Sequence, residues 1–259
     1  MDSENASSPR VWSEAGGGVE SLARRPLTQV WLISGLLLGL SATCVATLDR
    51  KCSSYLKTHP LWDELADLLD AAEHFGTPYG AGLILATVWL THSSFRSRVS
   101  RTFVAAISAG LLADLIKLCV SRTRPKAFDF AHSIGWSFTG VFPWGAGGSQ
   151  QQSFPSAHTA FAIAFAVMLG ELFPRARRWF LCLGGLVALH RVTTLAHFPS
   201  DVLAGAADGL VTARYFLGMT PLGLVYDRME RHYFPGELPV VGLGTGSPGL
   251  ACSEPARSV

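Results

Sequence analysis

The chain has 259 residues, of which 49% are hydrophobic and only 15% charged, and its mean hydropathy is +0.29. This balance argues against an ordinary soluble domain and is typical of a membrane protein with several spans. The net charge of +2 gives no reason to expect a nucleic-acid partner, and the five scattered cysteines match neither a disulfide framework nor a metal site.

The first apolar run follows a polar N-terminal segment. Residues 1–22 are rich in Ser, Gly, Ala and Glu, and we expect them to be disordered. Arg24 and Arg25 then precede a charge-free run over residues 26–48, which is long enough to cross a bilayer core. A signal peptide is the alternative, but the run is long and no clean cleavage site follows it.

Residues 49–76 combine leucines at helical spacing with acidic residues between them. This pattern predicts an amphipathic helix on the membrane or on the helix bundle, and a solvated loop helix is the alternative. A second charge-free run covers residues 77–95.

The third span is predicted over residues 102–120 and carries two charges at membrane depth. Asp114 and Lys117 are three residues apart, so they share one helical face, and such charges usually point into a bundle. Pro125 ends this helix.

Three further spans follow a loop over residues 126–154. They are predicted over residues 156–172, 179–195 and 199–217. The last contains Gly205-x-x-x-Gly209, a spacing that permits close helix contact, and Gly35-x-x-x-Gly39 repeats the spacing in the first span.

These elements predict an all-α fold: a polytopic membrane helix bundle with six transmembrane helices over residues 23–234. The tail, residues 235–259, is rich in Gly and Pro and is predicted to be disordered. Basic residues gather in the N-terminal segment, in the turns at 96–101 and 175–178, and in the tail. All four fall on one face, which should be cytoplasmic, so the polar clusters described next face the periplasm or the exterior.

The first cluster joins Lys117 to Arg124 across about two helical turns, so both can point to one site. The Arg fork matches phosphate oxygens in pairs, and Lys adds a point charge. The alternative is that Lys117 only neutralises Asp114.

The second cluster is Pro-Ser-Ala-His over residues 155–158. Ser156 is a good N-cap, and the free N–H groups of Ala157 and His158 would then form an anion site at a helix N-terminus. The alternative for His158 is a polar residue at the membrane interface.

The third cluster contains Arg191, His197 and Asp201. Pro199 suits the first turn of a helix, which places Asp201 near its third position, where the carboxylate can reach back toward His197. A carboxylate that fixes the tautomer of an imidazole leaves the other nitrogen basic, as a nucleophilic histidine requires. The alternative is a simple helix-capping pair.

Together, Lys-x6-Arg-Pro, Pro-Ser-x-His and Arg-x5-His-x3-Asp resemble the three-part signature of the type 2 phosphatidic acid phosphatase superfamily, which includes lipid phosphate phosphatases, glucose-6-phosphatases and vanadium haloperoxidases. The resemblance implies that His197 is the nucleophile that forms a phosphohistidine, that Asp201 orients it and that His158 protonates the leaving oxygen. It implies phosphate-binding roles for the remaining residues of the clusters, namely Lys117, Arg124, Ser156, Ala157 and Arg191.

Two positions depart from the family pattern. The family usually has Gly where this chain has Ala157 and Ser where it has His190. Alanine keeps the N–H group, so phosphate can still bind there, whereas His190 adds an imidazole beside the site. We expect both to affect rate or substrate more than the reaction type.

The function expected is that of a metal-independent membrane phosphatase, without a cofactor, acting on phosphatidic acid, phosphatidylglycerol phosphate or an isoprenyl diphosphate. A lipid phosphotransferase with the same phosphohistidine is the first alternative, since it differs only in the acceptor. A soluble haloperoxidase and a non-catalytic lipid-binding membrane protein are less compatible with six spans and a full set of site residues. The expected partners are the bilayer and its lipid phosphate; the bacterial inner membrane is the expected location, and the sequence leaves the oligomeric state open.

Overall fold

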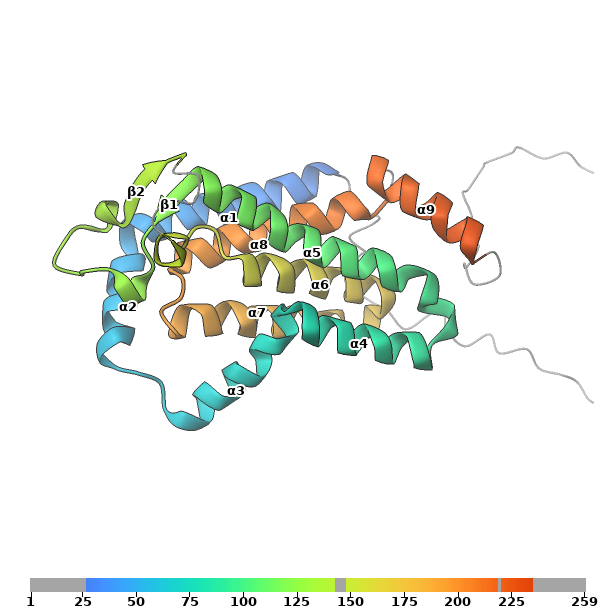
Figure 1. The fold of residues 1–259 in the computed structure, drawn as a ribbon, viewed down its shortest axis with the longest axis horizontal. Coiled ribbons are helices and arrows are strands. Elements are labelled where there is room, and N and C mark those ends of the chain that lie inside the picture. The colour runs from blue at the N-terminus through green and yellow to red at the C-terminus, as the bar shows by residue number, and fades with distance from the viewer. Residues whose placement is uncertain (1–26, 143–147, 219, 235–259) are drawn as a thin grey trace, which may run out of the picture.

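The computed structural model describes residues 27–142, 148–218 and 220–234. The two segments predicted to be disordered, residues 1–22 and 235–259, lie outside the described residues. The described chain forms a bundle of long helices that run along the long axis of the molecule (Figure 1).

Each of the six predicted apolar spans is a helix. They are α1 (Leu27–Thr47), α4 (Pro78–Thr91), α5 (Arg96–Cys119), α6 (Ala157–Leu172), α7 (Arg177–Thr193) and α8 (Pro199–Phe216). Within the described residues, two helical stretches, α1 and Ser93–Cys119, are long and apolar enough to cross a membrane. The predicted all-α bundle is therefore confirmed as a mostly helical fold, while six crossings stay a prediction.

The remaining elements are short. They are α2 (Asp49–Thr58), α3 (Asp63–Glu73) and α9 (Pro221–Tyr233), the strands β1 (Val120–Arg122) and β2 (Phe138–Val141), and single 3-10 turns at His74–Gly76, Ser93–Phe95, Pro125–Ala127, Ile134–Ser137, Ser149–Gln151 and Pro174–Ala176. The two strands pair in an antiparallel ribbon. They lie within or beside the segment predicted as a loop. The prediction that Pro125 ends the third helix is wrong: α5 ends at Cys119 and Val120 is already extended, so Lys117 and Arg124 are not two turns apart on one helix.

The predicted amphipathic helix is confirmed over α3, and Pro60 separates it from α2. In α3 the side chain of Leu69 is fully buried, whereas Leu68 is 55% exposed. Because α3 packs against α7, it lies on the bundle and is not a solvated loop helix.

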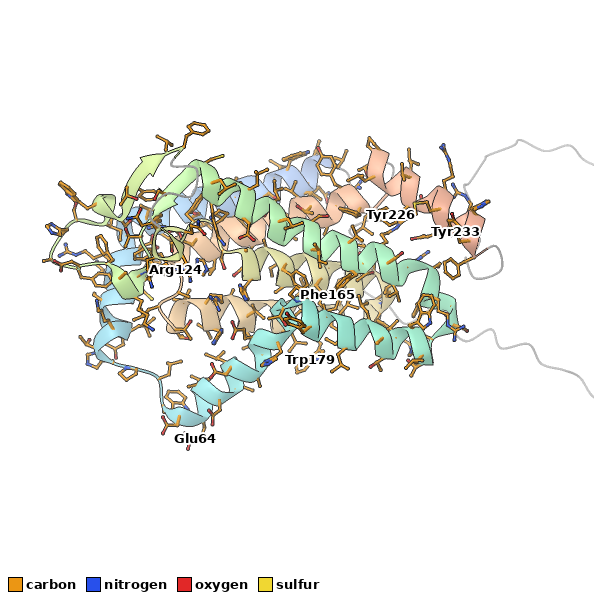
Figure 2. The ribbon with its side chains drawn as sticks, in the orientation of Figure 1. Glu64, Arg124, Phe165, Trp179, Tyr226 and Tyr233 are labelled. Carbon is orange, nitrogen blue, oxygen red and sulfur yellow. The ribbon has the colours of Figure 1, made fainter. Side chains whose placement is uncertain are left out.

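The core is built around α6, which packs against α5, α7 and α8. Its Phe165 is fully buried in the middle of the bundle (Figure 2). A Cβ on Gly205 would lie 2.4 Å from the carbonyl oxygen of Ser156, and one on Gly209 would lie 2.4 Å from that of Ala160. The close contact predicted for these glycines is therefore confirmed, and it brings the start of α8 against the start of α6.

The same expectation is wrong for the first span. A Cβ on Gly35 or Gly39 would meet nothing within 4 Å among the described residues. The reason is that these glycines lie away from the contact with α8, which α1 makes through residues such as Ser41, whose hydroxyl donates to the carbonyl of Ser200 at 2.8 Å.

The three polar clusters meet at one end of the bundle. There α5 and α7 end while α6 and α8 begin, together with α2 and the β-ribbon (Figure 1). The turn between α6 and α7 and the helix α9 lie toward the opposite end.

Candidate active site

The first cluster comes from the end of α5 and the segment after it. Lys117 lies in the last turn of α5, is buried, and places Nζ 2.8 Å from Oδ1 of Asp114. The predicted shared face is therefore confirmed, and Lys117 does neutralise Asp114. The positive charge of Lys117 also acts on His158 and His197, so the ion pair with Asp114 does not cancel this charge at the site.

Arg124 extends from the loop after β1. Its Nε donates to the carbonyl oxygen of Ser149 at 2.9 Å, and no carboxylate of the described residues lies within ion-pair distance of it. Burial lowers the pKa of Arg124, and the positive charge of Arg191 lowers it further. Two partly buried guanidinium groups that repel one another could together hold an anion between them.

The second cluster begins α6 as predicted. Ser156 is its N-cap, and its Oγ accepts from the backbone N–H of Thr159 at 3.4 Å. Ser156 is fully buried, so its hydroxyl serves the helix end, while Ala157 and His158 in the first turn are half-buried. An anion at this helix end would meet the N–H groups of Ala157 and His158 first.

The third cluster lies between α7 and α8. As predicted, Asp201 is the third residue of α8, and its Oδ2 accepts from the backbone N–H of Phe198 at 2.9 Å. His197 precedes this cap and is 1% exposed. The side chains of His197 and Asp201 thus meet at the start of α8.

The contact between them differs from the one expected. His197 Nδ1 donates to the carbonyl oxygen of Ser153 at 2.6 Å, and Asp201 Oδ2 lies 3.8 Å from the same nitrogen, at ion-pair rather than hydrogen-bond distance. The reason is that this carboxylate already accepts from Phe198 N, from Ser153 Oγ at 2.6 Å and from the Arg122 guanidinium. With Nδ1 protonated by this arrangement, Nε2 of His197 is the basic nitrogen.

Burial lowers the pKa of His197 below its usual value of 6.5. The nearby Asp201 opposes this effect, and the charges of Arg191 and Lys117 add to it. His197 is therefore a neutral imidazole at neutral pH, which is the form that can act as a nucleophile.

A buried ion-pair network behind the site was missed by sequence reasoning. Arg122, Asp49 and Asp201 are all fully buried, and the Arg122 guanidinium binds Asp201 on one side and Asp49 Oδ2, at 2.6 Å, on the other. Ser200 joins it by donating its backbone N–H to Asp49 Oδ1 at 3.0 Å. The signals were present: Arg122 stands inside the first cluster, and Asp49 is the first charge after the first apolar run.

Two acidic residues of α3 also reach the site, and sequence reasoning gave them no role there. Glu73 Oε1 lies 2.5 Å from Arg191 Nη1 and 3.8 Å from His158 Nε2. Asp70 Oδ1 lies 2.9 Å from His190 Nε2, within hydrogen-bond distance. His190, which departs from the family pattern, therefore links α7 to α3 through this hydrogen bond.

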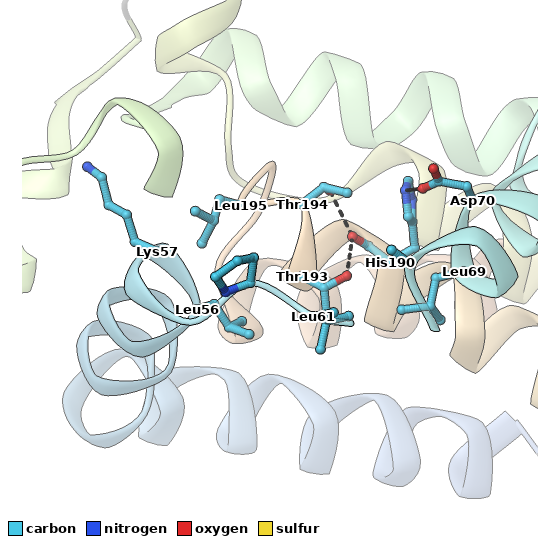
Figure 3. Close-up of a pocket in the computed structure, with 11 residues that line it drawn as sticks. Leu56, Lys57, Leu61, Leu69, Asp70, His190, Thr193, Thr194 and Leu195 are labelled. Carbon is cyan, nitrogen blue, oxygen red and sulfur yellow. Dashed lines mark hydrogen bonds and ion pairs between the residues drawn. The ribbon is translucent and has the colours of Figure 1, made fainter. Parts of the chain in front are cut away.

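A cavity of about 310 Å³ lies beside the contact between Asp70 and His190 (Figure 3). Leu56, Leu61, Leu69 and Leu195 supply apolar walls, and Asp70 with His190 closes one side. The cavity therefore adjoins the α3–α7 contact that carries Glu73.

Comparison with known proteins agrees with the motifs. Residues 98–222 match the PAP2 superfamily model, and this range contains all three clusters. The chain contains a PAP2 superfamily domain.

The lipid A 1-phosphatase of Rhizobium etli is 40% identical over 108 residues, which is 41% of this chain and 44% of that protein. The lipid A 1-phosphatase of Rhizobium johnstonii is 38% identical over 118 residues, 44% of this chain and 46% of that protein. The match thus spans less than half the length of these relatives. The crystal structure of Aquifex aeolicus LpxE superposes with a TM-score of 0.49 and 19% identity, covering 64% of this chain and 93% of that one.

The PAP2 match begins after α3, so the carboxylates of Asp49, Asp70 and Glu73 are contributed from outside the matched range. Within the described residues, no group of three or more His, Cys, Asp or Glu is arranged to hold a metal ion. The candidate site within the matched range consists of fixed cations, two imidazoles and a helix N-terminus.

Proposed function

We propose that this chain is an integral membrane phosphatase that hydrolyses a lipid phosphate through a phosphohistidine on His197. The observation that carries the proposal is the tautomer of His197: its Nδ1 donates to Ser153 O at 2.6 Å, which leaves Nε2 basic beside the cations of the PAP2 domain. That is the state a nucleophilic histidine needs.

In the first step, His197 Nε2 attacks phosphorus, the bond to the leaving oxygen breaks, and His158 gives its proton to that oxygen. In the second step, water attacks phosphorus while His158 takes the water's proton, the bond from phosphorus to His197 Nε2 breaks, and inorganic phosphate leaves. The charge on the equatorial oxygens is stabilised by Lys117, Arg124 and Arg191 together with the N–H groups at the start of α6.

The network behind His197 suits this reaction. Two buried carboxylates, Asp49 and Asp201, share one Arg122, so the network keeps one net negative charge. Positive charge develops on His197 as it bonds to phosphorus, and a negative charge held at 3.8 Å from Nδ1 stabilises it.

Membrane insertion is supported by the exposed apolar faces of the long helices. Leu32 and Leu36 of α1 are 72% and 65% exposed, and Leu83 and Leu90 of α4 are 73% and 76% exposed. Apolar surface of this extent fits a lipid environment.

We propose the periplasmic face of the bacterial inner membrane for the site, because the basic turns are predicted on the other face. A cysteine at Ser149 should react with an impermeant thiol reagent on intact cells, and labelling only after lysis would reverse the orientation.

The substrate class is tested by a phosphate-release screen with the purified full-length chain. The candidates are phosphatidic acid, phosphatidylglycerol phosphate, an isoprenyl diphosphate and, from the names of the relatives, lipid A phosphorylated at its 1-position. Each is assayed with and without an acceptor lipid, so that transfer is separated from hydrolysis. Release of phosphate from none of them would refute the proposed function.

A further inference from the structure

The end of α3 brings a carboxylate into the group of residues that surrounds the reacting phosphoryl group. Glu73 Oε1 lies 2.5 Å from Arg191 Nη1 and 3.8 Å from His158 Nε2, and Oε2 lies 3.8 Å from His190 Nδ1. An acidic side chain opposes anion binding, so its position here calls for a reason other than phosphate affinity.

The position of Glu73 is on the leaving-group side. In an in-line displacement the leaving oxygen lies opposite the nucleophile His197 and next to the acid that protonates it, His158. Because Glu73 shares one of its oxygens between His158 and Arg191, its charge faces both the phosphoryl group and whatever departs from it.

We propose that Glu73 is a specificity-determining residue that favours phosphomonoesters, whose leaving group is a neutral alcohol, over diphosphates, whose leaving group is an anionic phosphate. The inference rests on the proposed function. A second phosphate bound near His158 would lie against the Glu73 carboxylate, whereas a hydroxyl would donate a hydrogen bond to it.

The expected size of the effect of Glu73 on the rate depends on how far its side chain is exposed to solvent. At about 4 Å, two like charges in a partly buried site would cost on the order of 10³-fold in rate. The Glu73 side chain is 29% exposed, so solvent screens it and we expect about tenfold.

Asp70 provides a matched control. It is a carboxylate on the same helix, one turn earlier, and it bonds to His190 Nε2 at 2.9 Å. Within the described residues it makes no ion pair with His158 or Arg191. Asp70→Asn therefore removes the same charge from α3 and leaves the leaving-group side unchanged.

The experiment compares farnesyl phosphate with farnesyl diphosphate, which share one tail and differ in the leaving group. The full-length chain in detergent, Glu73→Gln and Asp70→Asn are assayed for kcat/KM on both. The ratio of the two values from one preparation does not depend on the fraction of folded enzyme. We expect the unaltered chain to prefer the monoester and Glu73→Gln to lower the monoester-to-diphosphate ratio about tenfold, with Asp70→Asn unchanged.

Two results would overturn the assignment of Glu73 while the proposed function stands: a Glu73→Gln ratio equal to that of the unaltered chain, or an equal shift in Asp70→Asn. If the unaltered chain releases phosphate from neither lipid nor from any lipid of the screen, the proposed function itself fails and the inference fails with it.

Discussion

The two ends of the bundle both contain buried or partly buried arginines, but these arginines have different partners. At the end that carries α9, Arg101 binds the carboxylates of Asp227 and Glu230. At the end where the clusters meet, Arg124 donates to a backbone carbonyl, and Arg191 forms an ion pair with Glu73, whose side chain is 29% exposed.

The difference separates structural cations from binding cations. Arg101 has its charge matched by two carboxylates, which leaves little attraction for a further anion. Arg124 and Arg191 repel each other and, among the described residues, form an ion pair with one carboxylate, that of Glu73, so an arriving phosphoryl group would supply the missing negative charge. The same residue type thus stabilises the fold at one end and, in the proposed function, binds an anion at the other.

The largest effect is expected from removing the proposed nucleophile at the cluster end. His197→Ala should lower kcat/KM on the order of 10⁶-fold, since the intermediate cannot form. His232→Ala, at an exposed position of α9, is the matched control and should leave the rate unchanged. Comparable losses in the two variants would remove the distinction between the ends.

Replacing one arginine at each end by alanine tests the comparison directly. Arg124→Ala should lower kcat/KM by about 10²–10³-fold, because one stabilising group for the phosphoryl charge is lost, with little change in melting temperature. Arg101→Ala should lower the free energy of unfolding by about 3 kcal/mol, because Glu230 is left buried without its partner, with kcat/KM retained. Kinetics and thermal unfolding are measured on both variants. If both variants lower kcat/KM and the free energy of unfolding to the same extent, the distinction between structural and binding arginines is wrong.

Gly205→Ala tests the packing of α8 on α6 that brings the clusters together. Its Cβ would lie 2.4 Å from the carbonyl oxygen of Ser156, so α6 and α8 must separate. We expect a loss of about 1–3 kcal/mol in the free energy of unfolding, measured by chemical denaturation. Gly35→Ala is the control, since its Cβ meets nothing within 4 Å. Equal loss in both would show that helix contact is not the cause.

The smallest effect near neutral pH is expected from titration of His197. Its folded-state pKa lies below 6.5, so the unfolded chain binds the proton more readily as the pH falls through 6.5, and stability decreases toward acid. The rate constant kcat/KM should likewise fall only below about pH 6.5, where the nucleophile becomes protonated. A rate that still rises between pH 7 and 8 because His197 loses its proton there would contradict the burial argument.

Local chemistry explains why so much of the site was predictable. Ser156 as N-cap and Asp201 in the third position of α8 follow from capping rules that act within a few residues. The six apolar runs became helices because none contains a proline beyond its first residues, so no interior helix hydrogen bond is lost. The predicted meeting of the clusters needed only helices that alternate in direction.

Contacts that join distant segments could not be predicted in this way. Asp49 reaches Arg122, and Glu73 reaches Arg191, across more than seventy residues of chain, so no spacing rule relates them. The Ser153 carbonyl accepts the hydrogen bond from His197 Nδ1 because the Asp201 carboxylate already accepts from Arg122 and Phe198 N, a competition that appears only in the folded chain.

The central claim, that His197 becomes covalently phosphorylated, is tested most directly by rapid quenching with a radiolabelled lipid phosphate of the screen that the chain hydrolyses. The account predicts acid-labile, base-stable label on the unaltered protein and on His158→Ala, and none on His197→Ala. Label retained on His197→Ala but lost from His158→Ala would reverse the two histidines and contradict the account.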